Sequence, residues 1–355
     1  LGHDDPTMIR MLEDLTGLHA QEIPLDDKTV MSLFKNTSAL GVTPEELNGC
    51  PMGTLGIPEF GTDFAMGMLR DAKPQEFTDL IRISGLSHGT DVWLGNAQTL
   101  IENGTATIST CICTRDDIMT YLIHMGLDSA EAFDIMEKTR KGIIAKGKCK
   151  QWPEWKQDML DHGVPEWYTW SCEKIKYMFP KEQTAAYVMM AWRIAYCKVF
   201  YPLAYYAAFF SIRATSFSYE LMCQGKDKLE FYIAEYKKKD KLSAKEEGTL
   251  RDMRIVQEMY ARGFEFLPLD LYKSDARYFQ IVDGKLLPPF NSIDGMGDKA
   301  AESLAIAASG GKFLSKDDLR ERGKVSKSII ELLSDLDIIS DLPESNQLSF
   351  FDFTA

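Results

Sequence analysis

The chain has 355 residues, 45% of them hydrophobic, and a formal net charge of −13. This length accommodates two or three domains with real cores. The acidic balance argues against a simple nucleic-acid-binding protein, which usually shows a basic one.

The seven cysteines are scattered and form no CxxC pair. We therefore expect free thiols in a reducing cytosol, no structural metal and no zinc in this chain. The first ten residues lack the pattern of a signal peptide. Charges and Pro202 interrupt the most apolar stretch, so no membrane span is expected.

The charge is unevenly distributed. Residues 1–60 carry ten acidic side chains against three basic ones, whereas residues 138–150 carry six basic side chains and no acidic one. Local field governs binding to phosphates more than net charge does. The basic run is therefore either a phosphate-binding surface or a solvated face.

Residues 1–80 are predicted to form short helices joined by turns. Thr43 and Pro44, followed by two glutamates, have the pattern of a helix start with an N-cap threonine. Residues 53–61 (GTLGIPEFG) are rich in glycine and proline and predict a loop. The pattern leaves open whether this loop is functional or a plain connector.

A helical pattern begins at Phe77, and a turn is expected from Ile83 onward (ISGLSHGTDVW). Ser84, Ser87 and His88 bring small polar groups into one flexible segment, which suits a close approach to a ligand. An ordinary turn that caps the next helix is the alternative.

The next helix is predicted to start with Thr114 as its N-cap, after a strand face formed by Cys111 and Cys113. Arg115 in a first helical turn is unfavourable for the helix dipole, and it is tolerated if it faces an anion. Four tryptophans between residues 152 and 170 are expected to be packing anchors.

Residues 171–187 place Lys174, Lys176 and Lys181 around Tyr177 and Phe179. Cations beside flat rings can hold a phosphate at one end of a site and stack a base at the other. The alternative is a helix end with lysines near its C-terminus.

Aromatic residues at i,i+4 spacing across residues 184–214 predict a buried helix pair broken at Pro202. Residues 225–262 are charged and helical, and strand-like pieces follow between 263 and 287. Asp283 and Gly284 are predicted to form a hairpin turn. We expect a domain boundary near 220–260.

Residues 290–308 (FNSIDGMGDKAAESLAIAA) have the pattern of a helix-hairpin-helix. Gly295 and Gly297 would allow a tight turn with positive φ, and a helix is predicted from Asp298. The amide groups of such a hairpin face a phosphate of the DNA backbone, and Lys299 can add a charge contact.

Residues 312–342 predict two more amphipathic helices, capped at Ser315 and near Ser326. The polar C-terminal end contains a segment that is either a peptide anchor for a preformed pocket or a terminus that packs on its own domain. The anchor consists of Gln347, Leu348, Ser349, Phe350 and Phe351.

Eight strings in order along the chain resemble the C-terminal part of the PolC-type bacterial replicative DNA polymerase. This is the C-family DNA polymerase III alpha subunit of low-GC Gram-positive bacteria. The strings are LGHDDPTMIRMLEDLTG (1–17), GIPEFGT (56–62), ISGLSHGTDVWLGNAQ (83–98), CTRDDIM (113–119), CEKIKYMFPK (172–181), AAYVMMAWRIAYCKV (185–199), PPFNSIDGMG (288–297) and NQLSFF (346–351).

The resemblance implies a mainly α chain with a small β-containing portion, in which polymerase fingers precede a duplex-binding region. The implied divisions are 1–14 (end of the palm), 15–220 (fingers), 221–342 (duplex-binding region with a helix-hairpin-helix at 288–308) and 343–355 (flexible tail with a clamp-binding motif).

The implied function is that of part of a DNA-directed DNA polymerase in the cytoplasm, at the replisome. Its partners would be primer–template DNA, dNTPs, the sliding clamp and other replisome subunits. Two Mg²⁺ ions would be held by palm carboxylates upstream of Leu1. Asp4 and Asp5 are not those carboxylates, so no catalytic residue is expected here, and this fragment alone should be inactive.

The resemblance also assigns roles within the nucleotide site. Tyr177 would stack on the incoming base and Phe179 would shape the pocket behind it. Ser84, Ser87 and His88 would line the base or minor-groove side, and Arg115, Lys176 and Lys181 would contact the triphosphate.

Two positions depart from the family pattern. Glu182 and Gln183 stand where Ala-His or Ser-His is usual, and Phe350 replaces a leucine in a clamp motif that residues 352–355 follow. A stand-alone nucleotidyl transferase would need two nearby acids flanked by strands, which we do not find. The remaining alternative is a non-catalytic helix-hairpin-helix accessory protein tethered to a clamp.

Overall fold

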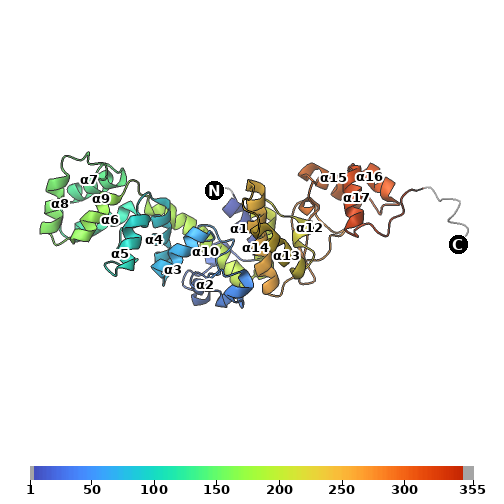
Figure 1. Ribbon diagram of the computed structural model, residues 1–355, viewed down its shortest axis with the longest axis horizontal. Coiled ribbons are helices and arrows are strands. Elements are labelled where there is room, and N and C mark those ends of the chain that lie inside the picture. Colours follow the sequence, from blue (N-terminus) through green and yellow to red (C-terminus); the bar gives the residue numbers. More distant parts are fainter. Residues whose placement is uncertain (1–3, 347–355) are drawn as a thin grey trace, which may run out of the picture. The chain divides into compact units, whose positions relative to one another are not determined.

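The computed structural model describes residues 4–346, and these are mainly helical with one small sheet, as the sequence predicts (Figure 1). The chain forms two compact units. Unit 1 comprises Leu1–His19, Gly41–Cys50 and Phe200–Ala355, and unit 2 comprises Ala20–Leu40 and Pro51–Val199. The sequence predicts that the fingers end and the duplex-binding region begins at residue 220. That functional boundary stays a prediction.

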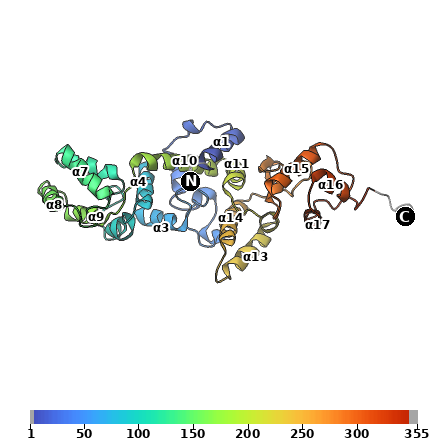
Figure 2. The same cartoon turned by 90° about the horizontal axis from the view of Figure 1, so that it is seen from above.

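Within the described residues, the secondary structure of unit 2 consists of helices and one isolated bridge. Its α-helices are α2 (Lys28–Ser32), α3 (Asp63–Ala72), α4 (Phe77–His88), α5 (Gln98–Glu102), α6 (Arg115–His124), α7 (Ser129–Arg140), α8 (Trp152–Asp161), α9 (Glu166–Lys174) and α10 (Lys181–Phe200). Helices α7, α8 and α9 lie side by side in both views (Figures 1 and 2). The shorter turns are η1 (Ala20–Glu22), η2 (Ser38–Leu40) and the π-turn η4 (Trp93–Ala97).

Trp192 fixes α10 in the core of unit 2. Its indole Nε1 donates to the Pro24 carbonyl at 2.8 Å. Its ring stacks parallel on Phe34 with centroids 6.0 Å apart, and Phe77 packs edge-on at 5.6 Å. A large aromatic side chain whose N–H is satisfied stabilises a core strongly, so α10 is a rigid support for the segments around it.

Unit 1 holds the only described sheet. Its helices are α1 (Asp4–Thr16), η3 (Pro44–Leu47), α11 (Pro202–Ala208), η5 (Phe209–Arg213), α12 (Tyr219–Met222), α13 (Lys226–Lys237), α14 (Ala244–Ala261), η6 (Phe290–Ser292), α15 (Asp298–Ser309), α16 (Lys316–Gly323) and α17 (Lys327–Asp335). Strands β1 (Gln280–Val282) and β2 (Lys285–Leu287) pair antiparallel. Helices α15 to α17 pack around one core that includes Phe290, Ile293 and Leu304.

Several local predictions are confirmed. Asp283 and Gly284 form the β1–β2 turn with φ of 51° and 72°, the conformation that two-residue hairpin turns require. The Thr43 capping box starts a short 3₁₀ helix, and Ser315 and Ser326 cap α16 and α17. Pro202 separates α10 from α11.

Other local predictions are wrong. Helix α4 continues through Ser84 to His88, where a turn was expected from Ile83. Cys111 and Cys113 lie in the loop before α6 rather than in a strand, with sulfurs 3.6 Å apart. The piece after Gly263 pairs only through a single bridge between Phe266 and Leu286. The four tryptophans after residue 150 are half-buried, and their predicted role as packing anchors stays a prediction.

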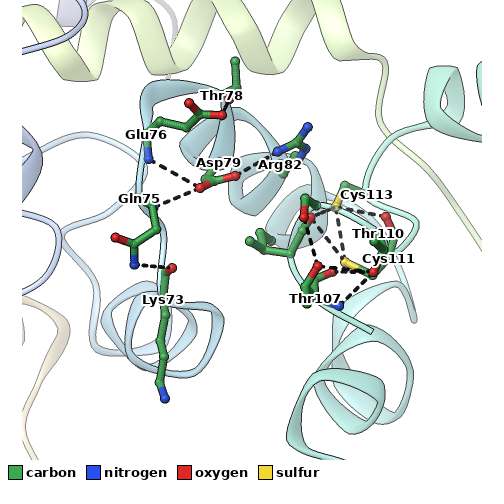
Figure 3. A network of polar contacts seen from close by, with 12 residues as sticks. Lys73, Gln75, Glu76, Thr78, Asp79, Arg82, Thr107, Thr110, Cys111 and Cys113 are labelled. Carbon is green, nitrogen blue, oxygen red and sulfur yellow. Dashed lines mark hydrogen bonds and ion pairs between the residues drawn. The ribbon is translucent and has the colours of Figure 1, made fainter. Parts of the chain in front are cut away.

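Two polar networks fix the start of α4 and the turn beside it (Figure 3). Asp79 accepts from the Gln75 amide at 2.9 Å and from Arg82 at 2.8 Å. Thr107 anchors the adjacent turn, because its amide donates to Thr110 Oγ1 at 2.8 Å. Satisfied helix-start amides hold α4 in one orientation. That orientation sets where its C-terminal end points.

All seven cysteines are free thiols. Burial raises the pKa of the Cys113 thiol well above its ordinary value. Among residues 4–346, no helix is long and apolar enough to cross a membrane.

Candidate functional site

A short antiparallel bridge joins the loop after α4 to the segment after α9. The Thr90 amide donates to the Tyr177 carbonyl at 2.9 Å, and the Lys176 amide donates back to the Thr90 carbonyl at 3.1 Å. A side chain on Gly89 would lie 2.9 Å from the Tyr177 carbonyl, so glycine is required for this approach.

Two further contacts bring the starts of α6 and α10 to the same place. The Arg115 amide donates to the Phe179 carbonyl at 3.4 Å. The Lys181 amide donates to Asp116 Oδ2 at 2.9 Å. The backbone therefore gathers Arg115, Phe179 and Lys181, three residues predicted for one site.

The aromatic side chains form a stacked support under an exposed ring. Phe179 stacks on His88 with centroids 4.8 Å apart and planes at 25°. Tyr187 packs against both rings, and Tyr177 meets Phe179 edge-on at 6.4 Å. Tyr177 is 43% exposed. An exposed ring on a packed base can stack on a flat ligand.

The α4 side chains are held by a residue that the sequence did not single out. Glu59 Oε2 accepts from Ser84 Oγ at 3.2 Å and forms a short contact with His88 Nε2. Ser87 Oγ donates to the Ser84 carbonyl at 3.0 Å. Ser84 is 1% exposed. The structure therefore places Ser84 beneath the site, with its hydroxyl already bonded.

The three predicted phosphate-binding cations differ in their partners. Lys176 Nζ pairs with Asp91 Oδ2 at 2.8 Å. This hydrogen bond and the charge of Asp91 raise the pKa of Lys176. Within residues 4–346, neither the Arg115 guanidinium nor the Lys181 ammonium forms an ion pair. These two cations are available to an anionic ligand.

The basic run borders the same segment. Gly142 has a φ of 73°, and a side chain there would lie 2.5 Å from the Lys176 carbonyl. Arg140 forms two hydrogen bonds of 2.9 Å with Glu137, and they lower the pKa of that carboxyl. Lys146, Lys148 and Lys150 are exposed, so positive charge extends outward from the site.

All eight residues predicted for the nucleotide site thus lie in one region of unit 2. Glu59, Asp91 and Tyr187 were missed. The string GIPEFGT around Glu59 predicts a loop, but the contact of Glu59 with His88 spans 29 positions. Nothing local in the sequence signals that contact.

The predicted hairpin in unit 1 lies between η6 and α15. Ile293 and Met296 are buried, whereas Gly295, Gly297 and Lys299 are exposed. Gly295 has the expected positive φ of 85°. The same expectation for Gly297 is wrong, because Gly297 is the N-cap of α15 with φ of −73°. The free amides at the start of α15 therefore face solvent.

The sequence predicts that this chain holds no metal ion and that its C-terminal tail carries a clamp-binding motif. No group of three or more His, Cys, Asp or Glu side chains within residues 4–346 is placed to hold a metal ion. Asp5 pairs with Arg213 through a short contact. The predicted clamp-binding residues, Gln347 to Phe351, lie outside the described residues.

Comparison with known proteins matches both regions. Residues 5–163 match the family model of the bacterial DNA polymerase III alpha subunit finger domain, and residues 263–348 match a helix-hairpin-helix motif.

The chain is also similar to curated proteins named DNA polymerase III PolC-type. Identity is 52% over 352 residues with the protein of Caldanaerobacter subterraneus subsp. tengcongensis and 51% over 355 residues with that of Streptococcus suis. It is 52% over 352 residues with that of Bacillus cereus. Each comparison covers 99% of this chain and 24–25% of the relative. The chain thus spans about a quarter of their length.

Proposed function

The chain belongs to the PolC-type DNA polymerase III family, and we propose that it supplies the incoming-nucleotide site and a duplex-binding region of a replicative DNA-directed DNA polymerase. Residues 15–220 would act as fingers, 221–342 would bind the primer–template duplex, and 343–355 would form the tail. Such an enzyme would act in the cytoplasm with other replisome subunits.

The observation that carries this proposal is the arrangement around Tyr177. An exposed ring stands beside the Phe179–His88 stack. The Arg115 amide bonds to the Phe179 carbonyl and the Lys181 amide to Asp116, and neither side chain forms an ion pair within residues 4–346. A stacking platform beside the backbone of two residues with cationic side chains fits a nucleoside triphosphate, whose base is flat and whose phosphates are anionic.

In nucleotidyl transfer, the primer 3′-hydroxyl loses its proton and attacks the α-phosphate of the dNTP, and pyrophosphate leaves as the bond to the oxygen that bridges the α- and β-phosphates breaks. Arg115 and Lys181 would hold the triphosphate and stabilise its developing negative charge, while Tyr177 would orient the base. Family polymerases use divalent metal ions, and Mg²⁺ would stabilise the attacking and leaving oxygens. The described residues do not fit such an ion, so this chain would contribute binding and orientation, and palm carboxylates would hold Mg²⁺.

Replacing Tyr177 with alanine in the complete polymerase tests the nucleotide site. We expect kcat/KM for dNTP to fall about 10–100-fold, because base–aromatic stacking is worth about 1–3 kcal/mol, with duplex affinity unchanged. Phe133→Ala is the matched control, since Phe133 is an aromatic residue of unit 2 with 47% exposure. Equal losses of nucleotide use and duplex binding would refute the stacking role.

The hairpin between η6 and α15 would bind the DNA backbone. Its exposed elements are glycine backbone, helix-start amides and Lys299. Such groups contact phosphates without reading sequence, which is what a replicative enzyme requires.

The tail would bind the sliding clamp through Gln347, Leu348, Ser349, Phe350 and Phe351. A glutamine and paired aromatic side chains are residue types suited to anchoring in a preformed pocket. Removing residues 347–355 should lower clamp affinity and leave nucleotide use unchanged. A clamp titration with the same affinity for both chains would refute this assignment.

A further inference from the structure

Resting on the proposed function, we propose that Glu59 is a positioning residue of the nucleotide site. It would fix the ring of His88 so that Nε2 carries a proton and Nδ1 is the ring atom left for the nucleotide. Glu59 would do this from below the site, without touching the nucleotide itself.

The first support is the contact geometry. The Glu59 side chain is 9% exposed. Its Oε2 accepts from Ser84 Oγ and meets His88 Nε2. A carboxylate that has lost most of its water must receive hydrogen bonds from protein donors, and both donors here come from α4. Glu59 therefore joins two residues predicted to line the site.

The second support concerns which ring nitrogen of His88 carries the proton. An ionised carboxylate can only accept hydrogen bonds, and each nitrogen of a neutral imidazole is either donor or acceptor. Opposite an ionised Glu59, the Nε2 atom of a neutral His88 ring would carry the proton. Within residues 4–346, Nδ1 of His88 has no hydrogen-bond partner. The ring is held on Phe179 and is 25% exposed, so Nδ1 is the ring's remaining polar atom.

The third support is the backbone of Glu59 itself. Its φ is 71°, in the left-handed region, which costs about 1–2 kcal/mol for a residue with a side chain. Such conformations persist where the surroundings enforce them, often at functional sites.

Hydrogen bonds from the surrounding residues hold the loop around Glu59 in its conformation. Lys198 is completely buried, and its Nζ donates to the carbonyls of Gly53 and Leu55, each at 2.7 Å. Thr54 Oγ1 closes the loop on the Phe60 carbonyl at 2.7 Å. The loop of residues 53–61 is therefore held in one conformation by these hydrogen bonds. Under this proposal it supports the nucleotide site and is more than a plain connector.

The tautomer can be measured in this chain without any polymerase activity. Two-bond ¹H–¹⁵N correlation spectra of chain labelled at histidine report which ring nitrogen carries the proton. The chain has five histidines, and His88→Ala assigns the signal of interest. We expect an almost exclusively Nε2-protonated ring in the parent chain and a measurable share of the Nδ1-protonated form in Glu59→Ala. An unchanged His88 signal in Glu59→Ala would overturn the inference.

Kinetics of the complete polymerase supply the second measurement. Glu59→Ala should raise KM for dNTP about tenfold, as expected for losing one charge-assisted hydrogen bond, with duplex affinity unchanged. Glu59→Gln should recover most of the loss, because its amide oxygen can accept the same hydrogen bonds. Glu102→Gln, an exposed carboxylate of unit 2, is the control and should change nothing.

The two proposals fail in different ways. If Tyr177→Ala weakens nucleotide use but Glu59→Ala does not, the positioning role of Glu59 is wrong and the nucleotide site stands. If neither variant changes nucleotide use, the proposed function of the site is wrong. If Glu59→Ala raises KM and the glutamine variant gives no recovery, positioning through accepted hydrogen bonds is refuted.

Discussion

The two candidate binding surfaces of this chain are built in opposite ways. The site around Tyr177 in unit 2 presents side chains supplied by segments far apart in the sequence, from Glu59 to Tyr187. The hairpin in unit 1 presents mostly backbone and is complete within residues 290–309. A surface that orients a small ligand needs fixed side chains, whereas one that holds any duplex needs only amides and charge.

This difference decides where supporting residues are needed. His88 is held on three sides, by Glu59, Phe179 and Tyr187. Gly295 and Gly297 have no atoms within 4 Å of where a side chain would begin. Substitutions far from the ligand should therefore weaken the first surface, and substitutions at the contact itself should weaken the second.

The largest effect is expected at the cations of the first surface. Arg115→Ala should lower kcat for nucleotide addition about 10²–10³-fold, as removal of one group that stabilises developing charge typically does. Lys176→Ala should cost clearly less, because Lys176 already pairs with Asp91 and the Arg115 side chain forms no such pair in the described chain. Single-turnover rates at saturating dNTP measure both.

Phe133→Ala again serves as the control for that comparison, and all variants should bind duplex with parental affinity. A larger loss in Lys176→Ala than in Arg115→Ala would show that the Asp91 pair opens when nucleotide binds. It would contradict the division of cations into paired and available ones.

The hairpin could be predicted from sequence because all its determinants are local. Gly295, buried apolar positions at 293 and 296, and a helix from Asp298 lie within a few residues of each other. The β1–β2 turn was predictable for the same reason, since Asp-Gly between two short strand-like runs specifies it.

The support of the nucleotide site could not be predicted in this way. Ser84, Gly85 and Ser87 have the composition of a turn, yet α4 runs through them. Gly85 is needed because a side chain there would lie 2.7 Å from Thr114 and 3.0 Å from the Cys113 carbonyl. Packing between α4 and the start of α6 therefore overrides helix propensity. Only tertiary structure shows that pairing, as it alone shows the Glu59 contact.

A smaller effect is expected at Gly297, where a substitution should lower duplex affinity with little change in stability. Its φ of −73° and ψ of 166° suit a β-branched residue, and no atom lies within 4 Å of the added side chain. Gly297→Val should therefore lower the free energy of unfolding by only about 0.5–1 kcal/mol, because valine is less favourable than glycine at a helix N-cap. Its side chain would stand between the helix-start amides and a phosphate, so duplex affinity should fall about tenfold, or roughly 1.4 kcal/mol.

Gly295→Val separates backbone strain from lost contact. Its φ of 85° is unfavourable for any side chain, so this variant should lower stability by about 1–2 kcal/mol, and any loss of binding there is ambiguous. Fluorescence anisotropy with duplexes of two unrelated sequences, alongside urea unfolding, distinguishes the cases. If Gly297→Val retained both stability and affinity, the phosphate would lie elsewhere, and the second surface would depend on side chains just as the first does.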